Sequence, residues 1–365
     1  MRVPVITLSR IVFLLALAAV GGCASQATPP VPFVHPEVLY LQDKPCARLY
    51  VEVDRMEGVK LPEHWADELK AFLEKYCLKP DGVDVVLDAP LPIDEYQGFP
   101  IGLASVLCID GPPANDRPPP AYVHLFVYDG RTTFQGSMRN PRVVRLCSTG
   151  IFMNVDYARY SPEAVAIHML RHECGHVLGL SQNTAHGDGA HCRKPGCLMH
   201  PVPDWLSQLG GTVHLYFREH ALCADCERDL SVCRAGPAEE SLSFAGPFLV
   251  RQTGGYCVAS LPFCDILIAS PTPSVFNWRE ALTQTKAGIR ASAASNSGER
   301  RISKDDHWTC WTTFYARSEV NASPEVRAEN VAILTKALND PSPFVKQIAA
   351  TGLKEREEAA QSQKQ

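Results

Sequence analysis

Residues 172–176 read His-Glu-Cys-Gly-His, a set of residue types whose spacing suits metal-dependent hydrolysis. On a helix, residues four positions apart share one face, so the imidazoles of His172 and His176 can reach the same zinc ion. Glu173 then lies beside the zinc-bound water and can act as its general base. The pattern predicts a zinc-dependent hydrolase, against the alternative of a polar helix face that binds no metal.

Gly179 extends the pattern to HExxHxxG, and a glycine there lets the chain turn sharply and return a third ligand. In the common spacing the third histidine comes three residues after the glycine, where this chain has Gln182 and Asn183 instead. The next histidines are His186 and His191, within the glycine-rich segment "HGDGAH". Either can supply the third ligand.

The residues that follow resemble a known signature. The segment "HCRKPGCLM" and the later "CADC" give HC-x4-C-x-M followed by CxxC, a pattern similar to that of the archaemetzincins, a metzincin family of zinc peptidases. The resemblance implies a catalytic zinc, a second, structural zinc, and a Met-turn below the catalytic metal. Its implied residues are His172, His176 and His191 for the catalytic zinc, Glu173 as the base, Cys192, Cys197, Cys223 and Cys226 for the structural zinc, and Met199 for the Met-turn.

The chain departs from this family pattern between Gly179 and His191. Eleven residues separate the two where the family has two, so "SQNTAHGDG" reads as a nine-residue insertion. Loop insertions cost little free energy, and the HC-x4-C-x-M pattern resumes after this one without a gap. We therefore favour His191 as the third ligand, with His186 as the alternative. The four cysteines can instead form disulfides if the protein is exported.

The N-terminus predicts export. Residues 1–22 combine two arginines, the apolar run "IVFLLALAAV" and small residues, as secretory signal peptides do. "VGGC", ending at Cys23, resembles a bacterial lipobox, which implies lipidation of Cys23 and anchoring to a bacterial membrane, either the outer membrane or a periplasm-facing one. Otherwise the protein is secreted. Residues 23–45 are proline-rich and read as a tether.

Composition bounds the partners. The formal net charge is −5 over 365 residues with no long basic run, so nucleic acid is not an expected partner. The chain has 14 cysteines, and an odd number remains if Cys23 is lipidated, so disulfides cannot account for all of them. Pairs are possible among Cys46, Cys77, Cys108 and Cys147. The segment "GGYCVASLPFC" can form either a strand pair or a small disulfide loop between Cys257 and Cys264.

The elements that must position the site suggest an α+β fold with a metzincin-like mixed sheet and an active-site helix. Apolar patterns predict strands in 47–56, 83–89, 122–130 and 142–157 and a helix over 62–77, with Trp65, Leu69, Phe72, Leu73 and Tyr76 on its buried face. A second helix should begin at Ser161-Pro162-Glu163, a strong start signal, and end near Gly179.

We expect the peptidase domain to span residues 46–234 and an irregular extension to span residues 235–318. Residues 319–357 should form a HEAT-like helical hairpin, which makes the C-terminal region mainly helical. One such hairpin must pack on the main domain or on a protein partner. The leading hypothesis is a zinc metallopeptidase acting on peptides or proteins. The alternatives are a non-catalytic, zinc-containing scaffold lipoprotein that uses the hairpin as its contact surface, and a disulfide-stabilised structural module.

Overall fold

The computed structural model describes residues 37–361 apart from several gaps. The gaps are 60, 62, 97–98, 100, 114–117, 129–149, 155–162, 181–182, 190, 202–220, 238–240, 254–255, 262–263, 269–276, 296–323, 341–345, 347–348, 351, 355 and 358–360. Cys23, Cys147 and the Ser161-Pro162 helix start therefore lie outside the described residues. No helix in the described part of the chain is long and apolar enough to cross a membrane.

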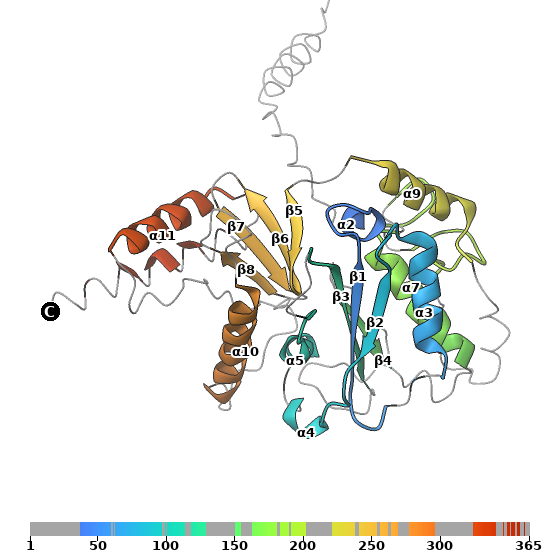
Figure 1. The fold of residues 1–365 in the computed structure, drawn as a ribbon, viewed down its shortest axis with the longest axis horizontal. Coiled ribbons are helices and arrows are strands. Elements are labelled where there is room, and N and C mark those ends of the chain that lie inside the picture. The colour runs from blue at the N-terminus through green and yellow to red at the C-terminus, as the bar shows by residue number, and fades with distance from the viewer. Residues whose placement is uncertain are drawn as a thin grey trace, which may run out of the picture. The chain divides into compact units, whose positions relative to one another are not determined.

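A four-stranded sheet lies at the centre of the first part of the chain, in the order β2-β1-β3-β4 (Figure 1). Its strands are β1 (Leu49–Arg55), β2 (Val83–Leu87), β3 (Ala121–Tyr128) and β4 (Gly150–Asn154), and every described pair is parallel. Six consecutive residues of β1 and all eight of β3 are buried, as expected of central strands covered on both faces. The α+β fold class predicted from the sequence is confirmed.

Two helices cover one face of this sheet (Figure 1). They are α3 (Trp65–Tyr76) and α7 (Glu163–Val177), and they are tied to each other by an ion pair between Glu68 and Arg171. All five side chains predicted for the inner face of α3 are buried. Between sheet and helices, Val51 and Val123 meet Leu73 and Cys174 in an apolar layer. This layer fixes the position of α7 over the sheet.

Short helices flank the same sheet. They are α2 (Glu37–Leu41), α4 (Ile93–Tyr96) and α5 (Ile101–Cys108), and α9 (Ala224–Ala235) follows later in the chain. Lys79 holds the first described residues in place. Its buried ammonium group donates hydrogen bonds to the carbonyls of Leu39, Gln42 and Cys46. Gln42 in turn donates to carbonyls at the C-terminal end of α9.

The expected irregular extension over 235–318 is wrong. Its described residues form a four-stranded antiparallel sheet in the order β5-β6-β7-β8, followed by helix α10 (Trp278–Ser295). The strands are β5 (Leu242–Ala245), β6 (Phe248–Thr253), β7 (Tyr256–Leu261) and β8 (Cys264–Ile268). Consecutive strands of this sheet pair antiparallel. Such short strands carry little periodicity for sequence analysis to detect.

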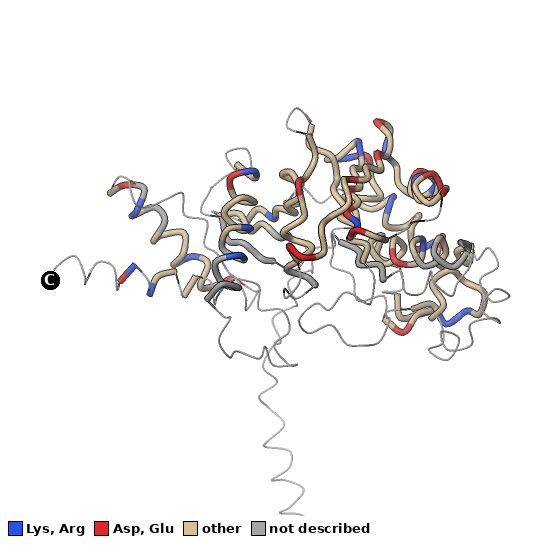
Figure 2. Tube along the Cα trace, turned by 90° about the horizontal axis from the view of Figure 1, so that it is seen from below, with Lys and Arg blue, Asp and Glu red and all other residues tan. Residues whose placement is uncertain are grey.

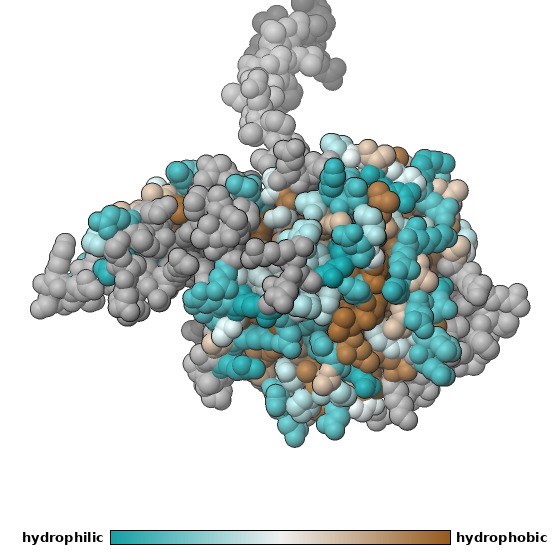
Figure 3. Space-filling model, viewed as in Figure 1, coloured by the Kyte–Doolittle hydropathy of each residue, from teal (hydrophilic) through white to brown (hydrophobic). Residues whose placement is uncertain are grey.

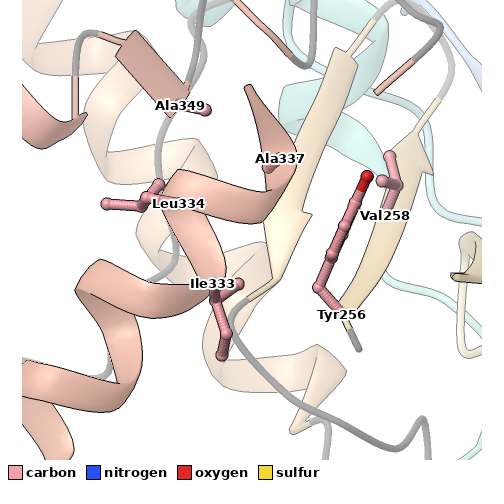
Figure 4. Packing of buried hydrophobic residues seen from close by; sticks show 6 residues of the cluster. All are labelled: Tyr256, Val258, Ile333, Leu334, Ala337 and Ala349. Carbon is pink, nitrogen blue, oxygen red and sulfur yellow. The ribbon is translucent and has the colours of Figure 1, made fainter. Parts of the chain in front are cut away.

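The hairpin region packs on this second sheet. Ile333, Leu334 and Ala337 of α11 (Pro324–Ala337) are buried with Tyr256 and Val258 of β7 and with Ala349 (Figure 4). Asp340, just beyond α11, accepts hydrogen bonds from Tyr256 at 2.5 Å and Arg251 at 3.3 Å. The apolar face of α11 is therefore used within the chain.

Charges of both signs are interspersed over the described elements (Figure 2). Hydrophobic residues reach the surface near β2 (Figure 3), the strand at one edge of the described sheet, where Leu87 is 42% exposed. The disulfides expected among Cys46, Cys77 and Cys108 do not form, because all three are free thiols. Cys257 is also a free thiol, and its neighbour across the sheet is Ile268 instead of Cys264.

Candidate metal centres

Helix α7 brings His172 and His176 together. Their Nε2 atoms lie 3.2 Å apart and their ring centroids 4.8 Å apart. Zinc binds histidine nitrogen at about 2.0–2.1 Å, so two nitrogens on a tetrahedral zinc ion stand about 3.3 Å apart. The pair therefore has the spacing that one zinc ion requires.

His191 completes the group. Its ring centroid lies 5.4 Å from that of His172 and 5.2 Å from that of His176. One nitrogen from each of the three histidines falls within 4.8 Å of the others. The alternative ligand, His186, lies elsewhere, beside Cys192 and Asp229. The inserted loop therefore lets His191 reach the pair.

Hydrogen bonding and burial prepare the histidines to bind a cation. The Nδ1–H of His172 donates to the carbonyl of Leu198 at 2.7 Å, which leaves Nε2 as the basic nitrogen. Burial lowers the pKa of His172 to about 4 and that of His176 to about 3, and it also lowers the pKa of His191. All three imidazoles are thus neutral at pH 7 and can donate lone pairs to a metal.

Glu173 lies between the two helical histidines and is 7% exposed. Burial raises its pKa to about 8. A carboxyl group with this pKa is a stronger base than an ordinary glutamate, which suits proton transfer near neutral pH.

Two glycines of the motif have steric roles. Gly175 lies against Met199, and a Cβ at Gly175 would overlap the methionine sulfur. Met199 is fully buried, so the methionine expected to form the Met-turn does pack beneath the histidine helix. Gly179 follows α7 at φ 79°, a conformation that favours glycine, and a Cβ there would overlap the side chain of Glu37. Of these two glycines, sequence analysis predicted a structural role only for Gly179.

Four cysteines form a second cluster. Cys192 and Cys197 come from the loop after the insertion, while Cys223 and Cys226 stand at the start of α9. The sulfurs of Cys192 and Cys223 are 3.8 Å apart, and those of Cys197 and Cys226 are 3.7 Å apart. A disulfide requires about 2.05 Å, whereas zinc–sulfur bonds of about 2.3 Å place tetrahedral sulfurs about 3.8 Å apart. The spacing fits zinc and excludes disulfides in this conformation.

Hydrogen bonds favour the thiolate at one of these cysteines, Cys197, whereas the pKa values of Cys192 and Cys226 are raised. The Cys226 thiol hydrogen bonds the sulfur of Cys197, and this bond lowers the pKa of Cys197 to about 5. The backbone N–H of Cys223 donates to the same sulfur at 3.4 Å, and the N–H of Lys194 donates to Cys192 at 3.5 Å. Soft thiolate ligands in a closed tetrahedron select zinc over hard cations.

Sequence analysis missed a third buried cluster, on the sheet face opposite α3 and α7. Glu52 accepts hydrogen bonds from the N–H groups of Asp110 and Gly111 and from the hydroxyl of Tyr122. Beside it, the Nε2–H of His124 donates to Asp54 at 2.8 Å. The signal for this cluster is the register of two strands, because Glu52 of β1 lies directly beside His124 of β3. Because Asp110 and Gly111 follow α5 in the chain, these hydrogen bonds attach the end of α5 to the sheet.

Two further histidines in the described part of the chain lie outside the groups above. His168 is buried one turn before His172, with its ring stacked on that of His172 at a centroid distance of 6.3 Å. His200 lies after Met199, where its Nδ1 is 3.1 Å from the carbonyl oxygen of Pro201.

Comparisons with known proteins find little sequence similarity. No family model matches the chain, and no curated protein matches it. Among solved structures, the crystal structure of archaemetzincin from Methanopyrus kandleri is 16% identical to it. The match covers 51% of this chain and 96% of the archaemetzincin chain, with a TM-score of 0.35.

Proposed function

We propose that this protein is a zinc-dependent peptidase. The observation that carries the proposal is the convergence of His172, His176 and His191 on one point, with Glu173 in the same helix. Three neutral imidazoles form the ligand set of many hydrolytic zinc sites, and they leave one tetrahedral position open.

The donor set supports zinc over other cations. Three imidazole nitrogens suit zinc better than magnesium or calcium, which prefer oxygen ligands. A bound zinc ion would supply a Lewis acid that polarises the peptide carbonyl and lowers the pKa of water. His172 would be held in one tautomer by its bond to Leu198, as metal-binding histidines usually are.

Glu173 would carry the proton transfers. Its carboxylate would take a proton from the attacking water and return that proton to the leaving amine. Its place next to His172 in the helix keeps it at the metal without requiring it to bind.

The four cysteines would hold a second zinc with a structural role. A closed set of four thiolates leaves no position for substrate, so this metal would stabilise the loop that carries His191 and Met199. We further propose, from the sequence, an archaemetzincin-like activity on peptides or proteins, and export with lipid attachment at Cys23. Metabolic labelling with a radioactive fatty acid, lost in Cys23→Ala, tests the attachment.

The decisive experiment on function replaces Glu173. The purified full chain would be loaded with zinc and assayed on a library of quenched fluorescent peptides. Glu173→Gln should lower kcat by about 100-fold or more, because the amide cannot accept the proton, while the zinc content per chain stays unchanged. Glu74→Gln, on the exposed part of α3, is the matched control and should remain active.

Two results would contradict the proposal. One is a Glu173→Gln variant with full activity. The other is a zinc-loaded parent that cleaves no peptide in the library, which would favour the non-catalytic scaffold. Removal of zinc with a chelator should abolish activity, and added zinc should restore it.

A further inference from the structure

The described part of the insertion, residues 183–189, is held by hydrogen bonds between the two candidate centres. Asn183 organises it, since its backbone carbonyl accepts the N–H of Gly187 at 2.9 Å and its side-chain oxygen accepts the N–H of Ala185 at 3.0 Å. Gly187 forms a bridge with Cys192, and the carbonyl of His186 accepts the N–H of Arg193 at 2.9 Å. The loop therefore pairs with the segment that carries the first cysteine.

One carboxylate of α9 fastens this loop. Asp229 accepts a hydrogen bond from Nδ2 of Asn183 at 2.9 Å through one oxygen and from Nε2–H of His186 at 2.6 Å through the other. The side chain of His186 is only 10% exposed. Both bonds span more than 40 residues of sequence, and α9 also supplies Cys226. Asp229 thus fixes the ring of His186 relative to the helix that holds half of the cysteine cluster.

The other ring nitrogen of His186 faces a cysteine sulfur. Its Nδ1 lies 3.6 Å from Sγ of Cys192. We propose that His186, held by Asp229, is a positioning residue of the four-cysteine zinc site, with its ring hydrogen bonded to the Cys192 sulfur. The inserted loop would then be part of this metal centre. The proposal rests on the structural zinc of the proposed function.

The chemistry of the cluster explains why such a partner is needed. A zinc site with four thiolate ligands has an excess of negative charge. N–H groups that donate hydrogen bonds to the sulfurs offset this charge. Cys192 receives one such bond, from the backbone of Lys194 at 3.5 Å. For His186 to add a second, its ring must carry a hydrogen on Nδ1 as well as the one on Nε2 that Asp229 accepts, so that the ring stands as a cation between the Asp229 carboxylate and the Cys192 thiolate. In metal sites generally, partners of this kind orient the ligand and raise its affinity for the metal.

The same loop reaches the histidine centre. Asp188 accepts the N–H of His191 at 2.6 Å through its side chain and donates its own N–H to the carbonyl of His191 at 3.0 Å. His191 directly precedes Cys192. A loosened Cys192 would therefore loosen His191, so loss of the His186 contact should weaken zinc binding at both centres, and more strongly at the cysteines.

The test measures metal release from the cysteine centre by itself. The full chain would be loaded with cobalt, whose thiolate charge-transfer absorption reports only on cysteine ligation, and mixed with an excess of chelator. His186→Ala should release this metal about 10-fold faster or more, in line with the usual effect of such partners on metal affinity. His186→Asn can keep an N–H near the position of Nδ1 without reaching Asp229, and should give an intermediate rate.

His64→Ala is the matched control, since His64 is an exposed histidine before α3. It should release cobalt at the rate of the parent. The proposal is overturned if His186→Ala also matches the parent, or if the parent shows no thiolate absorption at all. Neither result depends on peptidase activity. Failure of the proposed catalytic role would appear instead as a cobalt- or zinc-loaded parent that cleaves nothing while His186→Ala still releases metal faster.

Discussion

The two candidate metal centres share one stretch of chain but are built in opposite ways. The histidine centre takes two of its ligands from consecutive turns of α7, a helix fixed against the central sheet. The cysteine centre takes two ligands from a loop and two from the first turn of α9. A rigid helix can present ligands before metal arrives, whereas a loop of short turns depends on the metal for its own shape.

The two centres also differ in how far the protonation of their ligands prepares them to bind metal. Burial, helped by the repulsion between neighbouring histidines, lowers the pKa of His172 and His176 and keeps their rings neutral and ready to bind. The cysteines must lose protons, and they are only partly prepared for it, because the Cys197 and Cys226 sulfurs are hydrogen bonded to each other. Metal binding at the cysteines should therefore be coupled to folding, and metal binding at the histidines to catalysis.

The largest effect should follow from removing one cysteine ligand. Cys226 is fully buried, and Cys226→Ser should empty the cysteine centre and destabilise the loop that carries His191. Structural zinc contributes about 10–16 kcal/mol in small zinc domains, so we expect the zinc content to fall from two ions per chain to one or none. Elemental analysis after gel filtration measures it.

Cys233→Ser is the matched control for that variant. Cys233 lies on the same helix, α9, but outside the cluster. It should retain two zinc ions. A Cys226→Ser chain that also keeps both ions would contradict the difference between the two centres.

The second effect, on activity alone, should come from His191→Ala. This change removes a ligand of the histidine centre and leaves the four sulfurs in place, so zinc should fall from two ions to one and peptide cleavage should become undetectable. The thiolate absorption of the cobalt-loaded chain should be unchanged. If that absorption disappears as well, the two centres form a single cooperative unit.

Much of this site could be predicted because its information is local. His172, Glu173 and His176 share one helix turn, and the buried face of α3 follows directly from helical spacing. The choice between His186 and His191 could not be made this way, because it depends on how a loop of turns folds back. The hydrogen bond between His186 and Asp229, which lies 43 residues later in the chain, fixes the position of the His186 side chain.

The second sheet was predicted only in part, as a possible strand pair over 254–264, for a different reason. Its strands have four to six residues each, too few for alternation to stand out. The available signal was the turns, because Gly246-Pro247 and the glycine pair 254–255 each separate two apolar runs by two residues. The cluster around Glu52 had no such local signal, since its partners lie about 60 to 70 residues away.

A third prediction uses that cluster as a reference remote from both centres. Burial raises the pKa of Glu52 to about 7 from the ordinary value of 4.5. The folded state therefore binds more protons than the unfolded state between these values, so the contribution of Glu52 to stability is complete below pH 4.5 and is lost as pH rises through 7. The loss amounts to at most about 3 kcal/mol.

Urea unfolding at pH 5 and pH 8 measures this contribution. The free energy of unfolding should fall more steeply over this range in the parent than in Glu52→Gln, which does not titrate. Glu74→Gln, at an exposed position, should follow the parent. Equal slopes in the parent and in Glu52→Gln would show that the hydrogen bonds to Glu52 outweigh its burial.

The smallest effect tests one of the contacts between the histidine helix and the cysteine loop. Gly175 belongs to the histidine helix and Met199 to the cysteine loop, and a Cβ on Gly175 would overlap the methionine sulfur. Alanine in a helix interior is favoured over glycine by about 1 kcal/mol, while overpacking a buried site costs about 1–3 kcal/mol. Because Met199 is fully buried, the overlap should win, and Gly175→Ala should lower the free energy of unfolding by about 1 kcal/mol.

The sign of this effect should reverse when Met199 is shortened. In a Met199→Ala background the overlap is gone and only the helix preference remains, so adding Gly175→Ala should stabilise the chain by about 1 kcal/mol. The four chains form a double-mutant cycle, measured by urea unfolding with zinc present. Equal effects of Gly175→Ala in both backgrounds would mean that helix and loop do not meet at this point. A reversal would mean that the cysteine loop, through Met199, sets the packing beneath the histidine ligands.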